Sequence, residues 1–220
     1  PNCVNAWLVR LQPGADASLD DTATRAAHLQ QLWAFAQRLP SSFNSLKAHV
    51  LHAWLRHDLA QGAPDKQRFL AYLRLPRRTG HVAEKHLQNF GRGDEYVDLA
   101  RTWPTGLAAV APDDSDLVQS CLEHFFATED NQEAYAEWLD ADWLKAVLAE
   151  TKLLLGQGDA ERWYSLLADP ARVEALKQRV EIAFPPTMPT HFAANDAVSL
   201  TVDTKNVGTL LVKVYAIDAF

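Results

Sequence analysis

Apolar residues recur with the period of a helix over most of the chain, which predicts a run of amphipathic helices across residues 1–179. The first clear example covers residues 18–39, where Ser18 is the expected N-cap and Pro40 prevents the helix from continuing. Its apolar stripe, which should face a core, consists of Leu29, Leu32, Trp33 and Ala36.

Two more helices are expected between residues 41 and 76. The stretch 41–62 has the same spacing, and Gly62 is placed to take the left-handed conformation just after the helix end. A third helix should follow Pro64 and stop before Pro76, because proline is accepted in a first turn but not in a helix interior. The stripe of the longer helix is formed by Leu46, Val50 and Trp54.

Helical periodicity weakens between residues 77 and 106 and then returns. Regular stripes continue to Gly156, and Asp169 with Pro170 forms an N-cap and first-turn pair for a last helix. Cys121 lies on one of these stripes, where a free thiol packs as a small hydrophobic side chain. The positions expected to face the core in this half are Val118, Cys121, Leu122, Phe125, Leu144, Val147, Leu148, Thr151 and Leu155.

The period changes from helical to two near the end of the chain, which predicts strands over residues 180–184, 198–202 and 210–217. The last stretch is apolar on both faces, as in a strand that is buried on both sides. We therefore expect an α+β protein, with a mostly α-helical N-terminal domain over residues 1–179 and a few antiparallel strands over residues 180–220. Because an isolated pair of strands is marginal in water, helices or further residues should cover this sheet.

Charge and composition exclude two classes of partner. The formal net charge is −7 and the basic residues are dispersed, so the chain should repel phosphate backbones and nucleic acid is not an expected partner. No apolar run approaches the roughly 20 residues that span a bilayer, so no membrane span is expected. Cys3 and Cys121 alone do not suggest a disulfide framework. The predicted partner is another protein or neighbouring domains of the same chain.

His49, His52, His57 and Asp58 lie close together in one helix and could suggest a metal site. His49 and His52 share a face, but Arg56 falls between them, and a fixed cation opposes the binding of a divalent metal. We expect His49 and His52 to be solvated and His57 to be hydrogen-bonded at the edge of the core. Neither H-E-x-x-H nor paired C-x-x-C occurs, so no metal ligands and no cofactor are predicted.

Three short motifs have simpler structural explanations. The stretch from Asp140 begins like a calcium loop, but Lys145 stands where that loop needs glycine and Thr151 where it needs glutamate. Gly156–Gly158 lacks the strand and the later residues of a phosphate-binding loop, so it should end a helix. In the tripeptide Arg92–Asp94, which some adhesive proteins use, the aspartate is more simply the N-cap of a short helix.

Two groups of carboxylates also have structural explanations. Acidic residues in a first helical turn complement the helix dipole, as expected for Asp113, Asp114 and Asp116. Acidic residues four apart form a solvated helix face, as expected for Glu129, Glu133 and Glu137.

No pattern of a catalytic nucleophile is present, since the chain has neither a G-x-S-x-G elbow nor an activated exposed thiol, and no catalytic residue is predicted. A hydrolase-type enzyme remains the third hypothesis, because histidines such as His81, His86 and His124 could converge in the fold. Tryptophan is favoured at binding surfaces, but most of the seven lie at core spacing and are expected to pack. They are Trp7, Trp33, Trp54, Trp103, Trp138, Trp143 and Trp163.

Residues 198–217 carry a family resemblance. A strand of the form V-x-L-x-V leads through a polar N-V turn into L-x-V-K-V-Y-x-I. This pattern resembles the opening strands of a macroglobulin domain, as found in α2-macroglobulin-like and complement-like proteins. The resemblance implies a seven-stranded antiparallel sandwich, of which this chain would hold a truncated part. The matching residues are Val198, Leu200, Val202, Asn206, Val207, Leu210, Val212, Lys213, Val214, Tyr215 and Ile217.

The resemblance implies a non-enzymatic structural or interaction module, a fragment of a large α2-macroglobulin-like multidomain protein. Relatives often carry the thioester motif G-C-G-E-Q, which this sequence lacks, so no covalent capture is assigned to Cys3 or Cys121. The alternative is a helical-repeat scaffold that binds a peptide, because residues 5–16 resemble residues 52–65 at a period of 47 residues.

Overall fold

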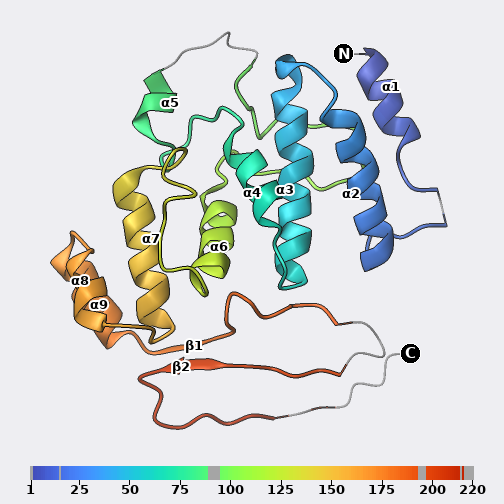
Figure 1. The fold of residues 1–220 in the computed structure, drawn as a ribbon. Helices are drawn as coiled ribbons and strands as arrows, with labels where there is room; N and C mark the ends of the chain where they lie inside the picture. Colours follow the sequence, from blue (N-terminus) through green and yellow to red (C-terminus); the bar gives the residue numbers. More distant parts are fainter. Residues whose placement is uncertain (1, 15, 89–94, 193–196, 214, 216–220) are drawn as a thin grey trace.

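The computed structural model of the protein describes residues 2–14, 16–88, 95–192, 197–213 and 215. Helices dominate these residues, and two short strands follow the last helix (Figure 1). Within them, no helix is both long and apolar enough to cross a bilayer. In chain order the elements are α1 (Asn2–Arg10), α2 (Thr22–Ala36), the 3-10 turn η1 (Ser41–Phe43), α3 (Asn44–Ala60), α4 (Lys66–Leu73), α5 (Glu84–Gln88), α6 (Ser115–Phe126), α7 (Ala141–Leu154), α8 (Ala160–Ser165), α9 (Pro170–Gln178), β1 (Glu181–Ala183) and β2 (Asp203–Lys205).

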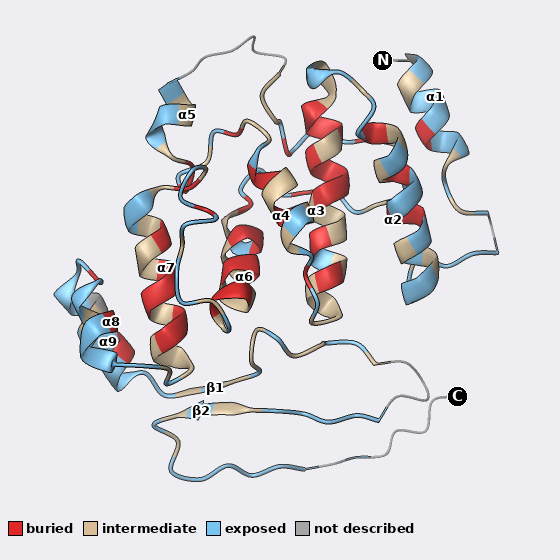
Figure 2. Cartoon of the chain, viewed as in Figure 1, coloured by how far each residue is buried: buried red, intermediate tan, exposed pale blue. Residues whose placement is uncertain are grey.

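The central helix is α3, because its apolar residues enter both hydrophobic cores. Buried residues occur along much of its length (Figure 2). Leu46 and Val50 belong to the smaller core, together with residues of α1 and α2. Leu51 and Leu55 belong to the larger core, which α4, α6 and α7 complete. All four side chains are 1% exposed or less, so α3 is apolar on two faces, as expected of a helix packed on two sides.

Aspartate side chains cap many of the helix starts. Asp21 accepts a hydrogen bond from the backbone N–H of Thr24 at 2.7 Å, so α2 begins at Thr22 and the cap predicted at Ser18 is wrong. The predicted pair of Asp169 as cap and proline in the first turn is confirmed for α9. The same kind of cap starts α4, α7 and α8 at Asp65, Asp140 and Asp159.

The predicted core stripes are confirmed, since every stripe residue of α2, α3, α6 and α7 is buried or half-buried. Gly62 and Gly156 each follow the C-cap residue of their helix, α3 and α7, and have φ of +68° and +62°, as helix-ending glycines should. The first helix, α1, places Val4 and Leu8, four residues apart, against the smaller core. Trp7 and Val9 beside Leu8 are 49% and 55% exposed.

The predicted truncated β-sandwich is wrong. Among the described residues only β1 and β2 are strands, and they form a two-stranded antiparallel sheet in which Ile182 pairs with Thr204. β1 lies inside the strand predicted over residues 180–184, but β2 follows the strand predicted over residues 198–202, which has no regular structure. The protein is therefore mostly helical with one small sheet, and the division into domains at residue 179 stays a prediction.

The predicted burial of the last apolar residues is also wrong. Leu200, Leu211 and Val212 are 59%, 75% and 72% exposed, so no layer covers the described part of this segment. Alternation of apolar residues favours a strand only when a second layer removes one face from water. Residues 214 and 216–217 of the predicted strand lie outside the described part of the chain.

Replacing Gly62 by alanine should destabilise the fold strongly. A Cβ at this position would lie 2.6 Å from the Thr187 carbonyl oxygen and 2.9 Å from the Pro189 nitrogen. We expect Gly62→Ala to lower the free energy of unfolding by about 2–3 kcal/mol, because left-handed strain adds to this backbone contact. Urea unfolding followed by circular dichroism measures the loss.

Gly156→Ala is the matched control, since Gly156 also has a positive φ but no heavy atom lies within 4 Å of an added Cβ. Its loss should be about 1 kcal/mol, from the backbone conformation alone. Equal losses for the two variants would contradict the close packing of residues 187–189 on the end of α3.

Candidate functional site

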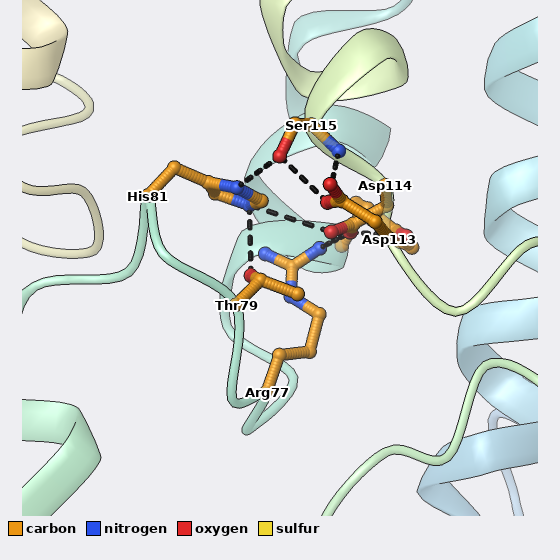
Figure 3. A network of polar contacts seen from close by, with 7 residues as sticks. Arg77, Thr79, His81, Asp113, Asp114 and Ser115 are labelled. Carbon is orange, nitrogen blue, oxygen red and sulfur yellow. Dashed lines mark hydrogen bonds and ion pairs between the residues drawn. The ribbon is translucent and has the colours of Figure 1, made fainter.

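A buried polar network joins segments that are far apart in the sequence (Figure 3). Tyr72 comes from α4, Arg77 and His81 come from the loop after α4, and Asp114 directly precedes α6. The side chains of Arg77, His81 and Asp114 are 2% exposed or less. The network therefore fixes the loop after α4 against the start of α6.

Asp114 is the centre of this network. Its Oδ2 accepts hydrogen bonds from the Tyr72 hydroxyl and from Arg77 Nη1, each at 2.6 Å. The Arg77 guanidinium also lies over the Tyr72 ring, with 4.3 Å between its Cζ and the ring centroid. Burial raises the pKa of the Tyr72 hydroxyl well above its ordinary value, so this group stays a proton donor.

His81 connects the network to α6 in its neutral form. Ser115 Oγ donates a hydrogen bond to Asp113 Oδ1 at 2.6 Å and therefore accepts from other groups. His81 Nδ1 lies 3.2 Å from Ser115 Oγ, and Nε2 lies 3.1 Å from the Thr79 hydroxyl and 3.4 Å from Asp114 Oδ1. Burial lowers the pKa of His81 below its ordinary value of 6.5, although the Asp114 carboxylate opposes this shift.

Ser115, His81 and Asp114 follow one another as in a serine hydrolase triad. In such a triad the serine proton points to the histidine, which donates its other N–H to a carboxylate. Here the Ser115 proton goes to Asp113, and the Asp114 carboxylate is already paired with Arg77. The ring of His81 is also inaccessible, with its side chain 1% exposed. The arrangement holds the loop after α4 against the start of α6 and provides no activated nucleophile.

One group of possible metal ligands occurs among the described residues, with atoms of His81, Asp113 and Asp114 within 4.8 Å of one another. Zinc accepts such nitrogen and oxygen ligands. However, Arg77 Nη1 lies 2.6 Å from the Asp114 carboxylate, and a fixed guanidinium repels a divalent cation. Asp113 in turn already accepts from both the hydroxyl and the backbone N–H of Ser115. The group fits an ion pair better than a metal ion.

Sequence reasoning missed the role of Asp114. Asp116 lies exposed in the first turn of α6, as the helix dipole predicts, and Asp113 accepts from a first-turn N–H at 3.0 Å. Asp114 makes no side-chain capping bond and is 1% exposed. Its partners Tyr72 and Arg77 lie 42 and 37 residues away, so no local pattern could indicate the pair.

The predicted solvation of His49 is wrong, because α3 is packed on two sides. His49 is 2% exposed, and its Nε2 lies 2.9 Å from the Thr105 hydroxyl. His52 is half-buried with its ring edge-on to Tyr72 at 6.5 Å between centroids, and His57 is half-buried too. That these histidines bind no metal stays a prediction.

The three histidines of the hydrolase hypothesis have separate partners. His81 belongs to the buried network, whereas His86 stacks on Trp138 with 5.0 Å between the ring centroids. His124 donates from Nδ1 to the Pro186 carbonyl oxygen at 3.2 Å. The structure does not bring the three rings together around one reacting atom.

The predicted solvated face of three glutamates is confirmed only in part. Glu133 and Glu137 are exposed, but residues 133–138 form turns and not a regular helix. Glu129 is half-buried and forms an ion pair with Lys66 at 2.7 Å.

The remaining motifs have structural roles or lie outside the description. Asp140 caps α7, and Gly156 follows the end of the same helix. Asp58 forms an ion pair with Arg68. Arg92–Asp94 lie outside the described residues.

The tryptophans mostly pack, as their spacing predicts. Trp103 and Trp163 are buried, whereas Trp7 is 49% exposed. The half-buried ones are Trp33, Trp54, Trp138 and Trp143.

A small surface cavity of about 130 Å³ lies beside the buried network. Arg77, which lines it, joins the cavity to the network. The guanidinium of Arg78 lies over the Tyr96 ring, with 4.4 Å between Cζ and the centroid. Arg74 is exposed at the same cavity. We call this the aromatic hollow, and its other walls include Pro76, Val82, His86, Tyr96 and Trp138.

Comparison with known proteins identifies the family. The family described as the actin-binding protein F N-terminal domain matches residues 1–180. The chain belongs to this family. It is also similar to "Actin-binding protein F" of Dictyostelium discoideum, with 30% identity over 188 residues that cover 84% of this chain and 8% of that protein. No solved structure matches the chain.

The family corrects the resemblance drawn from residues 198–217. The macroglobulin assignment is wrong, and so is the inference of a fragment of an α2-macroglobulin-like protein, because the family matches residues 1–180, which include all the described helices. Alternating valine and leucine over twenty residues is common to strands of many folds and therefore identifies none.

Breaking the buried pair should strongly destabilise the protein. We expect Asp114→Asn to lower the free energy of unfolding by about 3–5 kcal/mol, because it leaves the Arg77 charge buried without a partner. Asp142→Asn is the control, since the Lys145–Asp142 pair is exposed and should contribute about 0.5 kcal/mol or less. Urea unfolding measures both, and equal small losses would contradict the central role of Asp114.

Stability should fall on mild acidification. Burial, and secondarily the Arg56 charge, lowers the pKa of His52 from 6.5 to about 4, so the unfolded chain binds its proton first. Stability should therefore be lost as the pH falls from 6.5 toward 4, with about 2 kcal/mol from His52 between pH 7 and 5. His52→Gln should remove this part of the pH dependence, and the exposed His191→Gln should not. Urea unfolding at a series of pH values tests it, and parallel curves for His52→Gln and the parent would contradict it.

Proposed function

We propose that this chain is a non-enzymatic protein-interaction domain and that its partner is actin. Membership of the actin-binding protein F N-terminal family over residues 1–180 carries the proposal. The relative with 30% identity is named an actin-binding protein. This chain spans only 8% of the relative's length, so the region of contact has to be argued from the surface of this chain.

The polar side chains that could serve in catalysis are bonded to one another, which supports an interaction role and not a catalytic one. Ser115, His81 and Asp114 are the nearest approach to a catalytic constellation, and all three are used in the buried network. A catalytic base needs a group within reach of a substrate, and burial denies this to His81. We therefore look for the function in binding at the surface of the molecule.

The aromatic hollow is the surface that best fits a protein partner. Arginine, tyrosine and tryptophan are enriched where binding energy concentrates in interfaces, and the hollow contains Arg74, Tyr96 and Trp138. It also lies mainly in the basic part of the chain. Residues 1–110 carry 13 Lys and Arg against 9 Asp and Glu, whereas residues 111–220 carry 8 against 19.

Cosedimentation with actin filaments tests the proposal. The chain should pellet with filaments, and Arg74→Glu or Tyr96→Ala should each weaken binding by about tenfold or more, as expected for residues at the centre of an interface. Because a guanidinium takes part, binding by the parent chain should also weaken as salt shortens the Debye length.

Arg38→Glu is the matched control, since Arg38 is exposed after α2 and makes the same charge change away from the hollow. It should retain binding within about twofold. A parent chain that stays in the supernatant at all filament concentrations would refute actin as the partner.

A further inference from the structure

A second hollow lies between the helical body and the two-stranded sheet. It is a cavity of about 290 Å³ bounded by α6, α7, β1 and β2, and in Figure 1 the sheet runs beside the ends of these helices. A neighbouring cavity of about 350 Å³ shares Glu123, Phe184 and Pro186 with it and extends to the end of α3. We call the two together the ribbon groove. Each of the two cavities taken singly has a volume near the lower end of the roughly 300–1,000 Å³ typical of ligand sites.

The sheet turns its charged face toward this groove. Glu181 pairs with Lys205 and Ala183 with Asp203, and all four line the cavity and are half-buried. Ile182, between them on β1, faces away and is 56% exposed. A sheet that covers a core does the opposite and turns its apolar side inward. The inner face is therefore suited to a polar ligand and not to packing.

Negative charge dominates the cavity between the sheet and the helices, where four carboxylates face two cations. The neighbouring cavity adds Arg56. Arg179 Nη2 is engaged by Glu181 Oε1 at 2.7 Å. Burial raises the pKa of Glu123, and the nearby carboxylates Glu150 and Glu181 raise it further. A positive group placed there would relieve this repulsion. The charged residues of the cavity are Glu123, Glu150, Glu181, Asp203, Arg179 and Lys205.

The groove also has an apolar wall. Leu154 and Leu155 at the end of α7 face the cavity together with Phe184 and Pro186. Phe184 is 58% exposed, so its ring is available to a ligand. Such a wall suits the methylene stem of a long cationic side chain, with the charged head held by the carboxylates.

We propose that the ribbon groove binds an arginine side chain of an extended peptide segment on a partner protein. The planar guanidinium pairs with carboxylates through two parallel hydrogen bonds and stacks on an aromatic ring such as Phe184. The fixed cations Arg179 and Lys205 disfavour a bare metal ion in the same space. The neighbouring cavity, with Phe184 and Pro186 on its wall, accommodates the residues next to the arginine. This site is separate from the aromatic hollow and does not depend on actin as the partner.

Nuclear magnetic resonance of the full 220-residue chain, labelled with ¹⁵N, tests the proposal. The probe is the peptide acetyl-Ala-Ala-Arg-Ala-Ala-amide, and its citrulline analogue is the neutral isostere. We expect the arginine peptide to shift the backbone amides of Glu123, Glu150 and Glu181 with a dissociation constant of about 1 mM. The citrulline peptide should bind at least about tenfold more weakly, because the charged hydrogen bonds are lost.

Two substitutions in the groove should lower the affinity for the arginine peptide, and a third should raise it. Glu123→Gln and Asp203→Asn should each weaken the binding of the arginine peptide by about tenfold. Glu133→Gln, at an exposed residue outside the groove, should leave its binding unchanged. Lys205→Gln removes a competing cation and should strengthen binding by about twofold to threefold, a gain that misfolding would not produce.

Three results would overturn the proposal: equal binding of the arginine and citrulline peptides, shifts confined to residues outside the groove, or unchanged binding in all three groove variants. Actin cosedimentation of the same variants separates the two proposals. Glu123→Gln should leave the cosedimentation with actin unchanged, whatever its effect on the binding of the arginine peptide.

Discussion

The buried ion pair between Arg77 and Asp114 is the interaction on which the rest of the structure depends. It joins the loop after α4 to the start of α6, and the bond from Asp140 N to the His81 carbonyl oxygen at 2.9 Å adds the segment before α7. Such a pair contributes little net stability, because the loss of hydration offsets the attraction. The pair instead disfavours alternative folds, since any packing that separates Arg77 from Asp114 leaves a buried charge without a counter-charge. The pair thus favours one arrangement of three helices.

The same pair shapes the surface above it. Arg77 lines the aromatic hollow, and Asp114 holds its guanidinium in place, so the buried network fixes one part of the wall of the hollow. Rigid aromatic side chains lose little conformational freedom on binding, which leaves more of the contact energy for affinity. Under the proposal that this hollow binds the partner, the buried polar groups contribute by positioning the surface and take no part in a reaction.

The ribbon groove depends on the orientation of the two-stranded sheet. There the charged sides of β1 and β2 face inward and Ile182 faces water, which reverses the usual order of a sheet on a core. The hollow lies mainly in the basic part of the chain and the groove in the acidic part, so the two surfaces suit ligands of different charge. The two proposed sites therefore do not overlap, and a ligand at one leaves the other open.

The sequence by itself determined the main helices, their core stripes and the glycines that end them, because each of these depends on neighbours within about four residues. Only the tertiary structure decided that Asp114 is a buried partner and that His49 is shielded from water, since their partners lie 37 and 56 residues away. It also decided that the apolar residues described in the segment 198–215 are largely exposed. Alternation along residues 198–217 sets which side chains share a face, but whether that face is buried depends on a second layer that local sequence does not encode.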